Sequence, residues 1–311
     1  MSSSSLSSTA GSSSLPPLSL WARLIAVPAI WGGTFIAGRL VAAAMPASLG
    51  ALLRYVVASL ALCVAAWLIE GGLPRLTRRQ WLSTAALGAT GIFAYNLFFF
   101  GALKHLPASR TSLLIALNPV VTITLGTLLL REKLSARRWV GVALALAGVW
   151  VVISRGELGA ALSQSVGLGE ALMFGGVCSW AAYTLIGRTA LRGLSPLAAT
   201  CYASLWGTLM LGLATAAELQ TWPAAEAFTP AVLGSLLYLG LIGTALAFVW
   251  YYQGVQRLGA ARTVVFNNLV PVFGTVFGVL LLGEALLPSM LLGGTVAVAG
   301  VMLASGVFER R

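Results

Sequence analysis

Ten apolar stretches, each about as long as a helix that crosses a bilayer, run through this sequence of 311 residues. A transmembrane helix needs about 20 predominantly apolar residues. The stretches are continuously apolar with scattered glycines, which is typical of helices in lipid and not of alternating barrel strands. The fold class predicted is therefore an all-α membrane protein with ten transmembrane helices. They are expected at residues 20–38, 47–69, 80–102, 107–130, 136–154, 168–187, 195–217, 229–252, 260–282 and 288–307.

The composition excludes most other classes of protein. Only 9% of the residues are charged and 59% are hydrophobic, whereas about a quarter of the residues in a soluble domain are charged. A net charge of +11 would suggest nucleic acid as the partner of a soluble protein. Here the basic residues lie in short gaps between apolar stretches, so the predicted partner is the lipid bilayer, and no nucleic acid is expected. Residues 1–17 are rich in serine and are expected to form a disordered tail.

The distribution of lysine and arginine predicts the orientation, because cytoplasmic loops carry an excess of these residues. The loops on one side, taken with the two ends of the chain, hold fourteen of them, and the loops on the other side hold Arg39, Lys104, Arg110 and Arg155. Both termini are therefore expected in the cytoplasm. The excess of arginine over lysine and the abundant alanine suggest a bacterium, which makes the inner membrane the expected location. The fourteen are Arg23, Arg75, Arg78, Arg79, Arg131, Lys133, Arg137, Arg138, Arg188, Arg192, Arg257, Arg262, Arg310 and Arg311.

The two halves of the chain repeat one another. Trp31 and Gly38-Arg39 recur 149 residues later as Trp180 and Gly187-Arg188, and a second set recurs at an offset of 152 residues. We predict one repeat at 18–155 and another at 166–308. Each holds five helices, so the second copy must enter the membrane from the opposite side. Inverted repeats are typical of secondary transporters, although a duplication that serves only the scaffold is the alternative. The second set is Arg110-Thr111, Pro119, Gly126 and Glu132, matched by Arg262-Thr263, Pro271, Gly278 and Glu284.

Two prolines fall near the centres of corresponding stretches, the fourth and the ninth. Pro119 and Pro271 each remove a backbone donor and crowd the carbonyl four residues earlier, at Ile115 and Asn267. Matching interruptions in the two halves of a transporter indicate the substrate site. We therefore predict that both prolines act as hinges, with a packing kink away from the substrate as the alternative.

These features resemble a known family. Ten spans in two five-helix halves, the Arg-Thr, Pro and Glu pattern of stretches four and nine, the Trp31-Gly32 element and Arg54-Tyr55 are similar to the EamA-type permeases of the drug/metabolite transporter superfamily. The resemblance covers about residues 20–307. It implies a transporter that exports small metabolites, amino acids among them, and the YddG-type exporters of aromatic and other amino acids are the candidate subgroup. The expected mechanism is alternating access around a central cavity.

Polar and aromatic residues at membrane depth are the candidates for substrate binding. Buried amides must find partners, and their grouping on five stretches favours a shared cavity. The expected ligand is a zwitterion or a neutral metabolite, with its ammonium on carbonyls freed near the prolines and its carboxylate on Asn, Tyr or Trp donors. Interhelical hydrogen bonds without a cavity are the alternative. The candidates are Trp31, Tyr95, Asn96, Asn118, Trp180, Tyr183 and Asn267.

Three charged residues complete the predicted hinge and gate. Arg54 lies inside the second stretch, where a charge is costly; it either has a functional role or snorkels to the headgroups. Glu132 and Glu284 lie at the C-terminal ends of their helices, against the helix macrodipole. We expect a neighbouring helix start or a cross-bundle ion pair to hold them and the similarly misplaced Arg110.

Rival functions lack the residues they need. The sequence has no Asp, a single His at position 105, and no phosphate-binding loop, so we predict no catalytic residue, no metal site and no cofactor. No carboxylate falls at the centre of a span, which argues against a simple proton relay. A carrier of a nucleoside, a sugar or a drug-like metabolite remains an alternative, as does a channel or scramblase. A small-molecule substrate is the expected partner, and the expected oligomeric state is a monomer.

Overall fold

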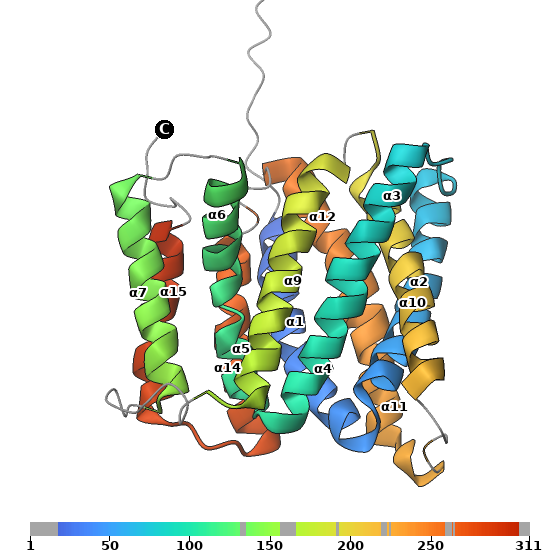
Figure 1. Ribbon diagram of the computed structural model, residues 1–311. Helices are drawn as coiled ribbons and strands as arrows, with labels where there is room; N and C mark the ends of the chain where they lie inside the picture. Colours follow the sequence, from blue (N-terminus) through green and yellow to red (C-terminus); the bar gives the residue numbers. More distant parts are fainter. Residues whose placement is uncertain are drawn as a thin grey trace, which may run out of the picture.

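The protein is described here by a computed structural model that covers residues 18–130, 135–155, 166–190, 193–218, 223, 225–258, 263 and 265–304. All regular secondary structure in these ranges is helical, and the helices stand side by side in one bundle (Figure 1). The all-α prediction is therefore confirmed for the described part of the chain. The serine-rich segment 1–17 lies outside the described residues, and its disorder stays a prediction.

The two halves of the chain place similar elements in the same order. The first half contains α1 (Leu18–Ala44), α2 (Ala47–Glu70), α3 (Arg78–Leu87), η1 (Gly88–Ala94), α4 (Tyr95–His105), α5 (Ala108–Leu114), α6 (Leu117–Leu130) and α7 (Ala136–Ile153). The second half contains α9 (Leu168–Ala190), α10 (Pro196–Glu218), η2 (Ala225–Ala227), α11 (Pro230–Leu237), η3 (Tyr238–Leu246), α12 (Ala247–Leu258), η4 (Val265–Leu269), α14 (Val270–Leu282) and α15 (Pro288–Ala304).

The outside of the bundle is apolar. Among the described residues, seven helical stretches are long and apolar enough to cross a membrane, and two further apolar stretches, Phe266–Leu282 and Pro288–Ala304, are shorter. Large side chains face outward, including Trp67, which is 68% exposed, and Leu280, which is 73% exposed. Water-facing surfaces rarely carry large contiguous apolar patches, so this exterior suits lipid.

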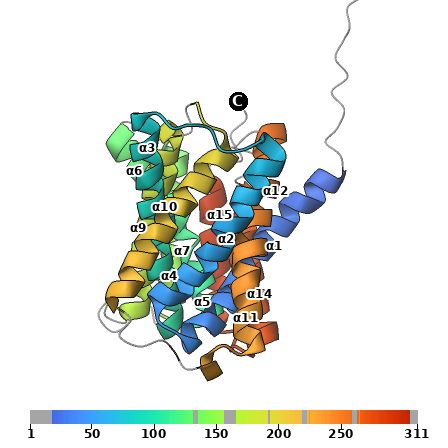
Figure 2. The same ribbon diagram turned by 90° about the vertical axis from the view of Figure 1, so that its right-hand side faces the viewer.

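Helix ends occur where the sequence provides caps. Thr77 and Gln80 form a capping box at the start of α3, in which each side chain accepts a backbone N–H from the other residue. Gly71 ends α2 with φ 75° and Gly283 ends α14 with φ 62°, a left-handed conformation that glycine adopts without strain. Beyond Gly71, the connection to α3 crosses one end of the bundle (Figure 2).

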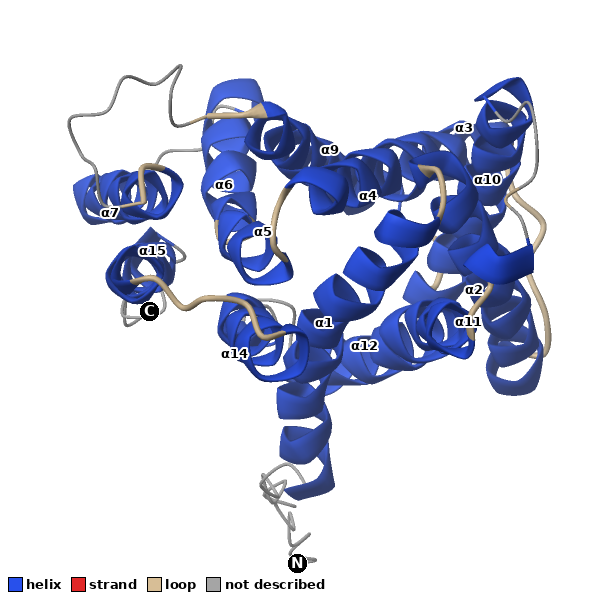
Figure 3. Cartoon of the chain, turned by 90° about the horizontal axis from the view of Figure 1, so that it is seen from below, coloured by secondary structure: helices blue, strands red, loops and turns tan. Residues whose placement is uncertain are grey.

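The helix α1 runs through the middle of the bundle, while α7 and α15 form a pair at one edge (Figure 3). This pair packs through glycines that recur at the offset of 152 residues, among them Gly148 and Gly300. A Cβ atom at Gly148 would lie 2.3 Å from the backbone nitrogen of Ala297, and one at Gly300 would lie 2.3 Å from that of Ala145. The described chain begins and ends at the same end of the bundle (Figure 1).

In each half, one π-helical stretch interrupts the third helical stretch: η1 in the first half and η3 in the second. Neither interruption was predicted from the sequence. Turns of π-helix often occur at functional sites. Gly88 and Gly91 of η1 recur 152 residues later as Gly240 and Gly243 of η3. All four positions lie in close contact with neighbouring helices, so the widened turns occur where the chain has room only for hydrogen.

Candidate functional site

A cavity of about 110 Å³ lies where helices from both halves of the chain meet. A buried water needs about 10–15 Å³ in the same measure, so the cavity has room for several waters or a small solute. Its walls combine aromatic rings with a few polar groups. They are formed by Trp31, Thr34, Phe35, Arg54, Tyr55, Tyr95, Phe99, Ile115, Ala116, Asn118, Pro119, Trp180, Gly243, Phe248, Asn267, Asn268, Val270, Pro271, Val298 and Val301.

Two groups of aromatic rings line the cavity. In the first group, the ring of Tyr95 lies 5.2 Å from that of Trp180 and 5.9 Å from that of Phe99, measured between centroids. In the second group, Trp31 lies 5.9 Å from Phe248 in an edge-to-face contact. Such pairs are rigid and polarisable, so they form a fixed wall for an apolar group.

The indole N–H of Trp31 is already used within the protein. It donates a hydrogen bond of 3.0 Å to the carbonyl oxygen of Gly243 in η3. Trp31 therefore presents its ring to the cavity and keeps its donor bonded to the backbone of a π-helical turn.

Arg54 lies in the cavity wall and does not extend to the outer surface. The residue is 7% exposed. Its Nη1 donates to Asn96 Oδ1 at 3.0 Å and its Nη2 to Thr244 Oγ1 at 3.3 Å, while Nε has no partner. The guanidinium also lies 5.2 Å from the ring centre of Tyr55. The snorkelling alternative is therefore wrong: the charge is held inside the bundle by neutral groups.

Two of the predicted binding residues do not line the cavity. Asn96 is fully buried, and its Nδ2 donates to Ile92 O at 2.7 Å while its Oδ1 accepts from Arg54. Tyr183 packs over Gly91 and lies 5.2 Å from the ring of Trp180. Each of these two residues contacts a side chain that lines the cavity, Asn96 that of Arg54 and Tyr183 that of Trp180, but neither belongs to the lining itself.

The other five predicted binding residues do line the cavity, and two of them carry buried oxygens without a partner. These are the Oδ1 atoms of Asn118 and Asn267. A buried acceptor that forms no hydrogen bond is costly and calls for an explanation such as a ligand. Trp31, Tyr95 and Trp180 complete this set.

Both prolines lie in the cavity wall, directly after an interruption of the helix. Before Pro119, α5 ends at Leu114 and α6 begins at Leu117, and the Ile115 carbonyl accepts from the backbone N–H of Asn118 at 2.9 Å. Before Pro271, the 3-10 helix η4 replaces α-helix. The interruptions at the two prolines were predicted. The expectation that the Ile115 carbonyl is free for a ligand is wrong, because this carbonyl is hydrogen-bonded within the chain. The side-chain oxygens of Asn118 and Asn267 are the acceptors in the cavity wall that have no partner.

The predicted gate residue Glu284 lies away from the cavity, at the end of the bundle where α5 begins. Its carboxylate accepts the backbone N–H groups of Ala108 and Ser109 at 2.7 and 2.8 Å. The first N–H groups of a helix have no partner within that helix, and the helix dipole favours an anion there. Glu284 thus follows α14 and caps α5, which is the neighbouring helix start that its position requires.

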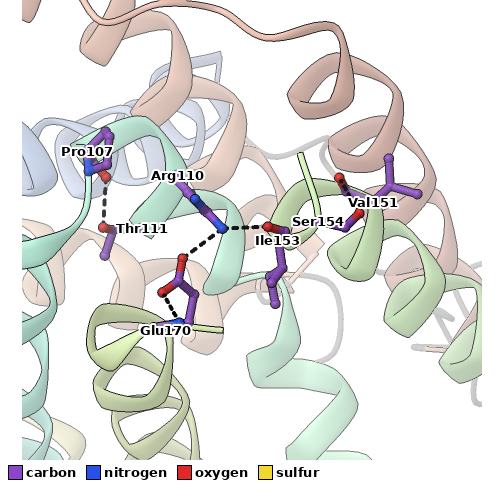
Figure 4. A network of polar contacts seen from close by, with 8 residues as sticks. Pro107, Arg110, Thr111, Val151, Ile153, Ser154 and Glu170 are labelled. Atoms are coloured by element: carbon purple, nitrogen blue, oxygen red, sulfur yellow. Dashed lines mark hydrogen bonds and ion pairs between the residues drawn. The ribbon is translucent and has the colours of Figure 1, made fainter. Parts of the chain in front are cut away.

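Arg110 is held by the cross-bundle ion pair that its position predicts (Figure 4). Its Nη2 lies 2.7 Å from Glu170 Oε1 and donates to the Ile153 carbonyl at 2.6 Å. These contacts tie α5 to the start of α9 and the end of α7. We call Glu284, Arg110 and Glu170 together the α5 lock. In the repeat pattern, Glu132 is the counterpart of Glu284 and Arg262 is the counterpart of Arg110, and both lie outside the described residues.

Sequence reasoning missed several members of the site. Phe99 and Phe248 line the cavity, Thr244 bonds Arg54, and Glu170 pairs with Arg110. In an apolar chain, a single Phe or Thr residue does not stand out as a candidate for a binding site. Thr244 could have been found from the glycines that recur in η1 and η3, because it directly follows Gly243.

Comparisons with known proteins point to one family. The model of the EamA-like transporter family matches residues 19–154 and again residues 167–306. The uncharacterized transporter YyaM of Bacillus subtilis is 26% identical over 94% of this chain and 95% of its own length. A probable terminal-alkyne amino-acid exporter of Streptantibioticus cattleyicolor is 32% identical over 91% of this chain and 92% of its own length. A solved crystal structure covers 94% of this chain and 99% of its own, with a TM-score of 0.67 and 20% identity, which shows a shared fold.

Proposed function

The chain belongs to the EamA-like transporter family, and from this premise we propose that it exports small metabolites across the bacterial inner membrane by alternating access. The relatives are named as transporters. The observation that carries the proposal is the cavity formed by elements of both halves, with a buried cation and unpartnered amide oxygens in its wall. Amino acids, aromatic ones included, are the proposed cargo.

The proposed topology has ten spans in two inverted repeats, with both termini in the cytoplasm. Three observations support it. The elements recur in the same order in both halves, the described chain begins and ends at one end of the bundle, and described arginines lie at that end, where α3 and α7 begin and α12 ends. An inverted repeat allows two similar halves to open one cavity to alternate sides.

The proposed gate uses the helix interruptions and the α5 lock. Pro119 and Pro271 leave weak points in two cavity-lining stretches, so the segments on either side can tilt. The lock joins α5, α14, α7 and α9 at one end of the bundle through Glu284 and Arg110. Glu132 is the proposed counterpart of Glu284 at the other end.

Transport by purified protein in liposomes tests this function. We expect the protein to exchange labelled amino acids from a panel that includes phenylalanine, tryptophan and leucine. Replacing Asn118 and Asn267 together with leucine should reduce the exchange about tenfold or more, because it removes two acceptors of the cavity wall. Exchange of a nucleoside or sugar but of no amino acid would contradict the substrate class, and flux of ions or lipid alone would indicate a channel or scramblase. Unchanged exchange in the double variant would place the binding site elsewhere.

A further inference from the structure

The guanidinium group of Arg54 has donors that the protein does not use. An arginine carries five N–H donors, and the contacts of Arg54 engage two nitrogens, with Asn96 and Thr244. Its Nε is buried and unpartnered. Within the described ranges the one ion pair is that of Arg110 with Glu170, so no described carboxylate neutralises Arg54. A buried cation held only by neutral groups is an incomplete arrangement.

The two neutral partners hold this cation in place and do not neutralise it. Asn96 donates an amide N–H to Ile92 O at 2.7 Å, and Thr244 donates its hydroxyl proton to Leu239 O at 2.9 Å. Both side chains therefore turn acceptor oxygens toward Arg54. Ile92 belongs to η1 and Leu239 to η3, so the π-helical stretch of each half helps to hold the guanidinium at the cavity wall.

Elsewhere in the same cavity, acceptor atoms lack hydrogen-bond donors. The Oδ1 atoms of Asn118 and Asn267 are acceptors without donors. They lie on the two interrupted stretches, in α6 and in η4. An ammonium group offers three donors and no acceptor, which matches these oxygens. The cavity therefore contains a site for an anion and acceptors for a cation, and aromatic rings line the same cavity.

We propose that Arg54 binds the carboxylate of the transported amino acid, and that Asn118 and Asn267 accept hydrogen bonds from its ammonium group. This inference rests on the proposed function and names the chemistry that selects the substrate. It reverses the expectation that Asn and Trp donors bind the carboxylate. The required substrate is a zwitterion with an apolar or aromatic side chain, and an amine without a carboxylate leaves Arg54 unpaired.

Arg54, the proposed anchor for the carboxylate, has no counterpart in the second half of the protein. Ser204 occupies the corresponding position of the second half, and it forms a 2.7 Å hydrogen bond with Ser59 outside the cavity. The substrate is thus expected to bind with one fixed polarity, its carboxylate toward α2.

A ligand series on the wild-type protein tests the proposal without any mutation. Proteoliposomes exchange labelled phenylalanine against unlabelled phenylalanine, phenethylamine, phenylalanine methyl ester or 3-phenylpropionate. Because a site built around a buried charge rejects ligands that leave it unpaired, we expect the amine and the ester to compete at least about tenfold more weakly than phenylalanine. If no amino acid of the panel is exchanged, the proposed function and this inference fail together. If phenylalanine is exchanged and phenethylamine competes equally well, only this inference fails.

Three variants assign the effect to Arg54. Arg54→Gln removes the charge, and Asn96→Asp keeps Arg54 but adds a carboxylate at the position of its 3.0 Å contact. Both should lose phenylalanine exchange by about tenfold or more, because the anchor is absent or already neutralised. The matched control, Arg257→Gln, removes an exposed arginine of α12 and should exchange as the wild type does. Asn96→Asp protein that folds and exchanges phenylalanine at the wild-type rate, with the amine still rejected, would overturn the assignment.

Discussion

Replacing Gly148 with leucine is expected to separate α7 from α15 and to prevent the protein from folding. Any side chain at this position meets backbone, since a Cβ atom would lie 2.3 Å from the nitrogen of Ala297 and 2.5 Å from the carbonyl oxygen of Gly293. Overpacking usually costs about 1–3 kcal/mol because side chains can shift. Here the backbones of both helices must move apart, so the free energy of unfolding should fall by more than that.

The measurement is the thermal midpoint and the size-exclusion profile of the protein in detergent. Gly234→Leu is the matched control, because Gly234 is exposed on α11 and a Cβ atom there meets nothing within 4 Å. We expect Gly148→Leu to lose the monodisperse peak and Gly234→Leu to retain it. A Gly148→Leu protein as stable as its control would show that α7 and α15 do not pack through these glycines.

Replacing Glu284 with glutamine is expected to loosen the end of the bundle where α5 begins. Hydrogen bonds to a charged group contribute about 1.5–3 kcal/mol each, and neutral ones about 0.5–1.5 kcal/mol. The carboxylate accepts two backbone N–H groups of α5, whereas an amide keeps only one oxygen and carries no charge. The difference corresponds to about a tenfold or larger increase in the population in which this end is open.

A cysteine at Ser112 reports this opening. Ser112 is fully buried, and its hydroxyl donates to Ser109 O within the contact of α5 with α14. With Cys63, Cys178 and Cys201 replaced, Ser112→Cys should react with a thiol reagent about ten times faster in the Glu284→Gln background. Glu226→Gln removes an equal charge from an exposed turn and should leave the rate unchanged. Equal rates in all three proteins would mean that Glu284 does not hold this end closed.

Much of the fold could be predicted because apolar length and turn residues act locally. The stretch expected at 47–69 is observed as Ala47–Glu70. The stretch expected at 20–38 instead continues to Ala44. The charged residue Arg39 was expected to follow the end of this transmembrane stretch. Instead, its guanidinium donates to the carbonyls of Leu103 and Leu106. The charge is therefore accommodated inside the bundle, and the helix continues past it.

The site was predicted in part, for a related reason. Pro119 and Pro271 interrupt helices through their own covalent structure, so their effect could be read from position alone. Whether Asn96 or Tyr183 faces the cavity depends on which helix packs against each, and no local pattern contains that information. The π-helical turns lie at close contacts between helices, such as that of Gly91 with Tyr183, and these contacts exist only after folding.

The close contacts also relate the two halves to each other. Gly91 of η1 lies against Tyr183 of α9, and Gly243 of η3 lies against Thr34 of α1. Thr34 and Tyr183 are 149 residues apart, which is the offset between Trp31 and Trp180, and Gly91 and Gly243 are 152 residues apart. Each contact joins the third helical stretch of one half to the first helix of the other half, so the two contacts correspond to each other under the repeat. This correspondence supports the proposal that the two halves exchange roles when the cavity opens to alternate sides.

The proposed function requires that the cavity opens to each side of the membrane in turn. The most direct measurement uses one cysteine at Ala116, which lines the cavity and is 7% exposed, in a protein without its native cysteines. A membrane-impermeant thiol reagent is applied to proteoliposomes from the outside only or the inside only. We predict modification from either side, slowed from both sides by saturating amino acid. Modification from one side alone, with or without substrate, would contradict alternating access.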